Sequence, residues 1–133
     1  MYLNPLVSII LPIRNERNSI AKTLDSIIEQ DFEKTKLEII ISDGLSTDGT
    51  LSIIKRYQSL YPNIHIINNK KKTVPSGFNF ALNIAKGDII IRVDGHTVIA
   101  PNYISQCVKI LKEKKATNVG GLMTPKSRNF LGN

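Results

Sequence analysis

The chain has 133 residues, 41% of them hydrophobic, and a formal net charge of +7. This length predicts one domain over residues 1–133 with a core of its own, and no apolar run reaches the roughly 20 residues that a membrane helix needs. The single cysteine excludes an internal disulfide, and Met1–Pro5 lacks a basic and then apolar leader, so we expect a cytoplasmic protein.

The first half of the chain alternates strand and helix patterns. Val7–Leu11 is an apolar, β-branched run that predicts a buried strand closed by Pro12. Apolar residues at helical spacing follow, and Asn18 or Ser19 should supply the capping side chain of that helix. A second strand, predicted over 37–42, leads into a polar turn that should cap a second helix.

The second half continues this alternation. The elements expected are a strand at 64–67, a helix opened by Ser76 and ended by Gly87, a strand at 88–93, a helix starting at Pro101 and a strand beginning at Val119. Strands that are apolar on both faces, alternating with helices, predict a mostly parallel sheet in a three-layer α/β/α sandwich. Residues 124–133 are polar and irregular, with no helix to cover the last strand, so we expect a truncated chain.

Polar groups suited to ligand binding follow three of the predicted strands. They are Arg14-Asn15-Glu16, Asp43-Gly44 and Asp94-Gly95-His96. In an open α/β sheet the carboxyl ends of the strands face the ligand crevice. A carboxylate and an imidazole two apart in an extended segment point to the same side, and together they suit a divalent transition metal such as Mn²⁺. Each motif alone is more simply a turn, so the specific signal is their combination.

These segments resemble the family 2 glycosyltransferases, which adopt the Rossmann-like, nucleotide-sugar-binding GT-A fold. The matching stretches are residues 7–16, 42–50, 77–88 and 92–96, and in order and spacing they cover roughly residues 6–122. The strongest signature is the Asp-Gly-x-Ser-x-Asp-Gly-Thr sequence that begins at Asp43. Family members of exopolysaccharide assembly that carry a histidine in the last motif look most similar.

The resemblance implies a role for each matched residue. Pro12 and Glu16 would line the nucleotide pocket, Asp43 would accept a hydrogen bond from the base, usually uracil, and Gly77 would let the backbone approach the nucleotide. Asp94, at the diphosphate, and His96 occupy the Asp-x-Asp motif, whose last residue contacts the metal. From its residue type, Arg14 either binds phosphate or caps the sheet edge. Since imidazole is a softer donor than carboxylate, we expect Mn²⁺ to be favoured over Mg²⁺.

The implied activity is inverting transfer of a sugar from a nucleotide diphosphate donor, UDP-sugar in the first place, to a saccharide or lipid-linked acceptor in polysaccharide biosynthesis. No catalytic base is identified in this chain; it is expected downstream. The alternative is a nucleotide-binding module without turnover. A generic doubly wound phosphate-binding domain is disfavoured, since no Gly-x-Gly-x-x-Gly or P-loop sequence follows the first strand.

The charged residues outside these motifs give weaker signals. Lys70–Lys72 could steer the anionic donor electrostatically. No aromatic residues alternate with the lysines, so a nucleic-acid partner is not expected; association of the full-length protein with the inner face of a membrane is left open. We expect solvated positions for Asp25, Glu29, Glu38 and Glu113, a structural or solvent-facing role for His65, and a core position for Cys107.

Overall fold

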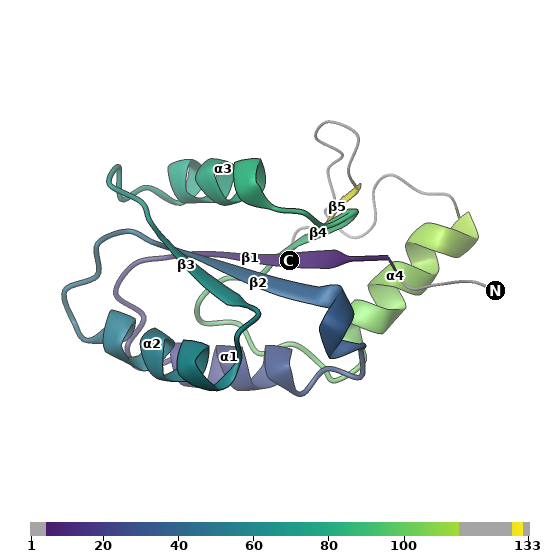
Figure 1. Cartoon of the computed structure of the whole chain (residues 1–133), viewed down its shortest axis with the longest axis horizontal. Coiled ribbons are helices and arrows are strands. Elements are labelled where there is room, and N and C mark those ends of the chain that lie inside the picture. Colours follow the sequence, from purple (N-terminus) through teal and green to yellow (C-terminus); the bar gives the residue numbers. More distant parts are fainter. Residues whose placement is uncertain (1–4, 115–128, 132–133) are drawn as a thin grey trace.

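A five-stranded parallel sheet forms the centre of the computed structural model, which describes residues 5–114 and 129–131 (Figure 1). The strands are β1 (Val7–Ile13), β2 (Leu37–Asp43), β3 (Ile64–Asn68), β4 (Ile89–Arg92) and β5 (Asn129–Leu131). They lie in the order β3-β2-β1-β4-β5, so the direction of strand addition reverses between β1 and β4. Such a reversal is the topological switch point at which open α/β sheets bind ligands.

Helices cover both faces of the sheet. Residues of α1 (Ile20–Ile28), α2 (Thr50–Leu60) and α4 (Tyr103–Lys114) pack in one core cluster, whereas α3 (Val74–Ile84) packs in a second cluster on the other face (Figure 1). The short 3-10 helix η1 (Lys34–Lys36) leads into β2. The predicted three-layer α/β/α sandwich is confirmed. Within the described residues, none of the helices combines the length and apolar character needed to span a bilayer.

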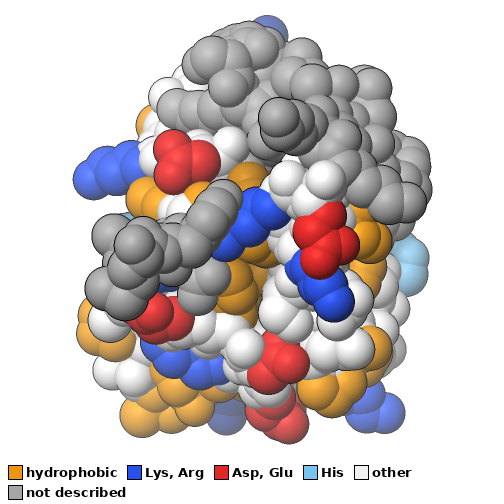
Figure 2. All heavy atoms as spheres, turned by 90° about the vertical axis from the view of Figure 1, so that its right-hand side faces the viewer, with side chains coloured by type: hydrophobic (Ala, Val, Ile, Leu, Met, Phe, Trp, Pro, Cys, Tyr) orange, Lys and Arg blue, Asp and Glu red, His pale blue; other side chains and the backbone are white. Residues whose placement is uncertain are grey.

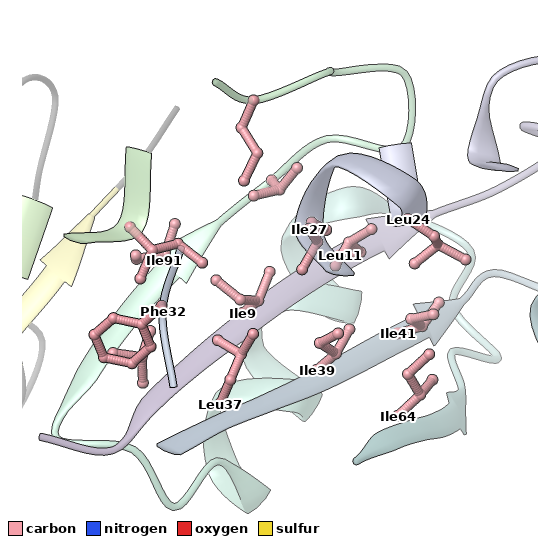
Figure 3. Packing of buried hydrophobic residues seen from close by; sticks show 14 of the residues in the cluster. Ile9, Leu11, Leu24, Ile27, Phe32, Leu37, Ile39, Ile41, Ile64 and Ile91 are labelled. Atoms are coloured by element: carbon pink, nitrogen blue, oxygen red, sulfur yellow. The ribbon is translucent and has the colours of Figure 1, made fainter. Parts of the chain in front are cut away.

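The two clusters follow from the alternation of side chains along each strand. Ile9 and Leu11 of β1 and Ile39 and Ile41 of β2 point toward α1 (Figure 3), while the intervening Ile10 and Ile40 of the same strands join the α3 cluster. Strands apolar on both faces are the pattern expected of a buried parallel sheet. As predicted, Cys107 packs within the larger cluster and His65 is solvent-facing.

Strand β1 continues past Pro12, which was expected to close it, and ends at Ile13. The Ile10 carbonyl accepts from the Val93 N–H at 3.0 Å. In a parallel strand the backbone N–H and C=O groups of alternate residues point toward the same neighbouring strand. The backbone nitrogen of Pro12 therefore points toward β4, as the backbone groups of Ile10 do, and the ladder between β1 and β4 ends at Arg92. The ladder needs no N–H at that position, so proline is tolerated within the strand.

Helix α3 begins at Val74, earlier than the predicted start at Ser76. Thr73 is the capping residue, and its Oγ1 accepts from the Ser76 N–H at 3.4 Å. The helix ends at Ile84, so Gly87 lies beyond its end. An alanine Cβ at Gly87 would lie 2.5 Å from Oγ of Ser8, which shows that this glycine is needed for close packing at the start of β4.

Two further elements differ from the expectation, and one prediction falls outside the described residues. Helix α4 begins at Tyr103, after a turn that contains Pro101. The strand predicted at Val119 lies outside the described residues. Within the segment expected to be irregular, Asn129–Leu131 instead forms β5 and pairs in parallel with β4.

Candidate functional site

The loops that follow β1, β2 and β4 leave the sheet at the same edge, on the left of Figure 1. The opposite face, at the amino ends of the strands, shows basic and acidic side chains interspersed with apolar ones (Figure 2). Cavities of about 420, 380 and 360 Å³ lie elsewhere, and none of these three is lined by Asp43, Asp94 or His96. The edge is therefore distinguished by the side chains that gather there.

Hydrogen bonds join the loop after β1 to the loop after β2. The Asn15 N–H donates to Oγ of Ser46 at 2.8 Å, and the Thr47 N–H donates to Oδ1 of Asn15 at 2.7 Å. Nε of Arg14 donates to the Gly44 carbonyl at 2.9 Å. Arg14 therefore ties two loops at the sheet edge, which is one of its two predicted roles; phosphate binding by its remaining N–H groups stays a prediction.

Asp43 lies at the base of this loop pair and is only 1% exposed. Its carboxylate accepts from the backbone N–H of Ser46 at 3.2 Å and from Oγ of Ser46 at 2.6 Å. Ser46 Oγ in turn receives the Asn15 N–H. Asp43 therefore organises the loop from within, and the local Asp-x-x-Ser spacing is a signal that could have predicted this contact.

The segment after β4 is a turn, so the extended geometry expected for Asp94 and His96 is wrong. The strand ends at Arg92, and the Thr97 N–H donates to the Asp94 carbonyl at 3.1 Å. Oδ1 of Asp94 lies 3.3 Å from a guanidinium nitrogen of Arg92. The Asp-Gly pair was itself a turn signal, and the turn gives each side chain a separate partner.

Gly95 sits in close contact with the loop after β1. A Cβ added there would lie 2.7 Å from Cγ2 of Ile13 and 2.9 Å from Cγ of Glu16. The Gly95 carbonyl accepts from Oγ of Ser19 at 2.9 Å and from Oγ1 of Thr23 at 3.1 Å. Ser19 occupies the N-cap position of α1 but makes no side-chain cap bond; its hydroxyl holds the turn instead.

His96 meets Glu16 across the switch point. Nδ1 of His96 lies 3.1 Å from Oε2 of Glu16, with the His96 side chain 66% and the Glu16 side chain 25% exposed. The hydrogen bond to Glu16, aided by the charge of that carboxylate, raises the pKa of His96. Through Glu16, Asn15 and Ser46, a continuous set of contacts runs from His96 to Asp43. The predicted convergence of the three loops is present.

Gly77 and Pro12 lie on the α3 side of the sheet. A Cβ at Gly77 would lie 2.9 Å from Nδ2 of Asn69, 3.0 Å from Oγ of Ser42 and 3.4 Å from Cβ of Pro12. Both Gly77 and Pro12 are buried. The absence of a side chain at Gly77 therefore lets α3 pack closely on the sheet, and its contact with a nucleotide stays a prediction.

A family model described as Glycosyl transferase family 2 matches residues 8–131. The chain belongs to this family. A Methanococcus voltae relative, dolichyl N-acetyl-alpha-D-glucosaminyl phosphate 3-beta-D-2,3-diacetamido-2,3-dideoxy-beta-D-glucuronosyltransferase, is 35% identical in an alignment of length 131 that covers 93% of this chain and 41% of the relative.

Solved structures of glycosyltransferases have the same fold. The mannosyltransferase PcManGT from Pyrobaculum calidifontis, in complex with GDP-Man and Mn²⁺, superposes with a TM-score of 0.77 at 32% identity, over 82% of this chain and 33% of that one. Residues 1–349 of S. aureus TarS, in complex with UDP-GlcNAc, give 0.72 at 26% identity, over 91% and 37%. The GT-A fold is confirmed, and the chain spans less than half the length of these three proteins.

Asp94 and His96 are the residues of this family 2 chain that would hold a metal, and their joint binding of one stays a prediction. Within residues 5–114 and 129–131 there is no group of three or more His, Cys, Asp or Glu side chains that could hold an ion. Asp94 and His96 offer two donors, and because Nδ1 of His96 faces Glu16, Nε2 is the nitrogen left to bind. A carboxylate behind a ligating histidine is the usual second partner of such a ring.

Proposed function

We propose that this chain is the donor-binding part of an inverting glycosyltransferase. It would bind a nucleotide diphosphate sugar, UDP-sugar in the first place, for transfer to a saccharide or lipid-linked acceptor in polysaccharide biosynthesis. Family membership supports the reaction class, and the M. voltae relative is named for a lipid-linked acceptor. The acceptor-side base is proposed to lie outside this chain.

One observation carries the proposal: the Asp94–Thr97 turn meets Glu16 at the switch point between β1 and β4, and the loop of Glu16 is tied through Ser46 to Asp43 at the end of β2. This is the place where an open α/β sheet binds a dinucleotide or nucleotide. Pro12, Arg14, Glu16, Gly77 and Asp94 form the proposed border of the nucleotide pocket, together with Asp43 beneath the base.

Asp43 is proposed to accept a hydrogen bond from the base. Because Ser46 covers the Asp43 carboxylate in the chain described here, this contact requires the Leu45–Ser46 segment to move. The backbone of Leu45 has a φ of 59°, a left-handed conformation that non-glycine residues adopt at some energetic cost. Release of this conformation would offset part of the cost of breaking the hydrogen bonds of Ser46.

Asp94 and His96 are proposed to hold the metal of the diphosphate. A bound divalent ion would neutralise charge on the leaving diphosphate. Arg92 keeps the Asp94 carboxylate at the edge through their ion pair, and both side chains in that pair are 34% exposed. Lys70–Lys72, exposed in the loop after β3, would add electrostatic attraction for the anionic donor without a fixed contact.

Thermal unfolding in the presence of UDP tests this proposal. A ligand at 100 times its dissociation constant stabilises the folded chain by about 2.7 kcal/mol, so UDP with Mn²⁺ should raise Tm and Mn²⁺ alone should not. His96→Ala should remove the part of the shift that depends on the metal. His65→Ala is the matched control, because His65 is exposed on β3 and should leave the shift unchanged.

GDP, ADP and inorganic pyrophosphate are each tested in place of UDP in the same assay. A shift with UDP alone supports uridine recognition, and an equal shift with all nucleotides limits the proposal to diphosphate binding. No shift with any of them, in a chain shown to be folded by circular dichroism, overturns the proposed function.

A further inference from the structure

The contact between Glu16 and His96 joins two loops that lie 80 residues apart in the sequence. Glu16 follows β1 and His96 follows β4, the two neighbouring strands of the switch point. The resemblance places Glu16 on the nucleotide, but its carboxylate is directed at the imidazole of His96, with Oε2 3.1 Å from Nδ1. The contact suggests a different task for Glu16.

The backbone of Glu16 is fixed on both sides of the residue. Its N–H donates to Oγ1 of Thr50 at 2.9 Å. Its carbonyl accepts from the N–H groups of Ser19 and Ile20 at 3.1 and 2.9 Å, at the start of α1. The carboxylate is therefore presented from a rigid support, which is what a group that orients another side chain requires.

The turn that carries His96 is fixed as well. Oγ of Ser19 and Oγ1 of Thr23 hold the Gly95 carbonyl from α1. The missing Cβ of Gly95 leaves room for the Glu16 side chain, since a Cβ there would lie 3.0 Å from Oε2 of Glu16. Both ends of the Glu16–His96 contact are thus built into the packing of β1, α1 and the turn.

The chemistry of the two groups decides which ring nitrogen is available. An ionised carboxylate can only accept hydrogen bonds, and a neutral imidazole has one N–H and one acceptor nitrogen. With Glu16 at Nδ1, that nitrogen must carry the proton, so Nε2 keeps its lone pair. The His96 side chain is 66% exposed, so the ring remains accessible from the edge.

We infer that Glu16 is a positioning residue: it fixes neutral His96 as the Nδ1–H tautomer and so presents Nε2 to whatever binds at the carboxyl edge. In the proposed function that ligand is the metal bound with the diphosphate. Only the identity of this ligand rests on the proposed function. The orientation of the ring is a property of the chain itself and can be measured without any ligand.

The first experiment reads the tautomer directly by long-range ¹H–¹⁵N NMR at a pH where imidazole is neutral. The chain has only two histidines, so exposed His65 is an internal reference. We expect His96 as the Nδ1–H form and His65 as the Nε2–H form that free imidazole side chains favour. Glu16→Gln keeps an acceptor oxygen and should retain the His96 tautomer, whereas Glu16→Ala should lose it. A wild-type His96 that matches His65 overturns the inference.

The second experiment separates an action through His96 from direct nucleotide contact. Calorimetry of Mn²⁺ with UDP should show that Glu16→Ala weakens binding by about 10–100-fold, the effect usual for a partner behind a metal ligand. In the His96→Ala background the same change should matter by less than about twofold. Glu29→Ala, an exposed acid at the end of α1, is the matched control and should not alter binding.

The outcomes are distinguishable. An equal loss on removing Glu16 in both backgrounds means that Glu16 touches the ligand directly, which overturns the inference while the proposed function stands. Absence of UDP and Mn²⁺ binding in the wild-type chain overturns the proposed function, and the tautomer measurement then decides the inference by itself.

Discussion

Replacing Gly95 by alanine tests how closely the turn after β4 packs on the loop after β1. The added Cβ would lie 2.7 Å from Cγ2 of Ile13 and 2.9 Å from Cγ of Glu16, about 1 Å inside the optimum of roughly 3.5–4.0 Å between carbon atoms. Ile13 is 4% exposed within the core, whereas the Glu16 side chain is 25% exposed. Glu16 is therefore the group expected to give way, and its contact with His96 should break.

The expected loss of stability follows from two opposing effects. Overpacking lowers the free energy of unfolding by about 1–3 kcal/mol. Exchange of glycine for alanine raises it by roughly 0.4–1 kcal/mol, because the unfolded chain then has fewer accessible conformations. Gly95 does not have a positive φ, so dihedral strain adds nothing. The net loss should be about 1–2 kcal/mol, measured by urea unfolding, and the Nδ1–H tautomer of His96 should disappear from the NMR spectrum.

Gly44→Ala is the matched control at the same edge, because its Cβ would come no closer than 3.3 Å to Arg14 or to the Ile13 carbonyl. It should cost less stability than Gly95→Ala and leave the His96 tautomer unchanged. If the two variants prove equally stable and His96 is unaffected in both, the packing argument for Gly95 is refuted.

Three further predictions concern the sheet and the metal. Gly87→Ala should lower the free energy of unfolding by at least about 2 kcal/mol, since its Cβ would lie 2.6 Å from the backbone nitrogen of Ser8; urea unfolding equal to wild type would contradict this. Titration calorimetry of UDP should show tighter binding with Mn²⁺ than with Mg²⁺ because imidazole suits Mg²⁺ poorly, and equal affinities would count against His96 as a ligand. The hydrogen bond to Glu16 raises the pKa of His96, so the pair stabilises the folded chain at low pH and this contribution is lost as pH rises through the folded pKa. Metal binding should have the opposite pH dependence and weaken as pH falls through that pKa, because protonated imidazole has no lone pair. NMR titration of His96 and calorimetry of metal binding at two pH values check the two directions.

The secondary structure was largely readable from the sequence because apolar residues set the elements. The β-branched runs that gave the first four strands are the residues that now fill both faces of the sheet. The residues at which helices and strands begin and end were harder to predict. Whether Pro12 closes a strand depends on which neighbour it faces, and that is fixed by the ladder with β4. Serine is a somewhat better capping residue than threonine by type, yet Thr73 caps the helix, and the proline in the first turn of α3 fits this earlier start.

Glu38 shows how a local expectation fails at a tertiary contact. It was expected to be solvated at the start of β2, but its Oε2 accepts from Oγ of Ser8 and from the Lys86 N–H at 2.5 and 2.6 Å. The Gly87 N–H also donates to Oγ of Ser8 at 2.8 Å. These partners come from β1 and from the connection between α3 and β4, so the residues near Glu38 in the sequence do not predict them.

The sequence predicted where in the fold the candidate site lies, but not which side chains contact one another there. Strand ends of a parallel sheet meet at one edge by rule, and that alone brought the three motifs together. The pairing of Glu16 with His96 depends on strand register. β1 and β4 pair Ile10 with Arg92, and continuing that register brings Ile13 beside Gly95, where the two residues are in contact.

Register also explains why this arrangement is specific to one alignment of β1 and β4. A slip of one residue would turn every side chain of β4 to the other face of the sheet, so Arg92 would point into the face that α1 covers and Ile91 into the face that α3 covers. Ile89, Ile90 and Ile91 are at most 4% exposed and would be buried on either face, so it is the cost of burying the Arg92 guanidinium that disfavours the slip. The register therefore fixes where the turn begins, and the turn fixes which nitrogen of His96 faces Glu16. On this reasoning, core substitutions that loosen β4 should disturb the His96 tautomer before they unfold the chain, although they lie on the far side of Arg92 from the site.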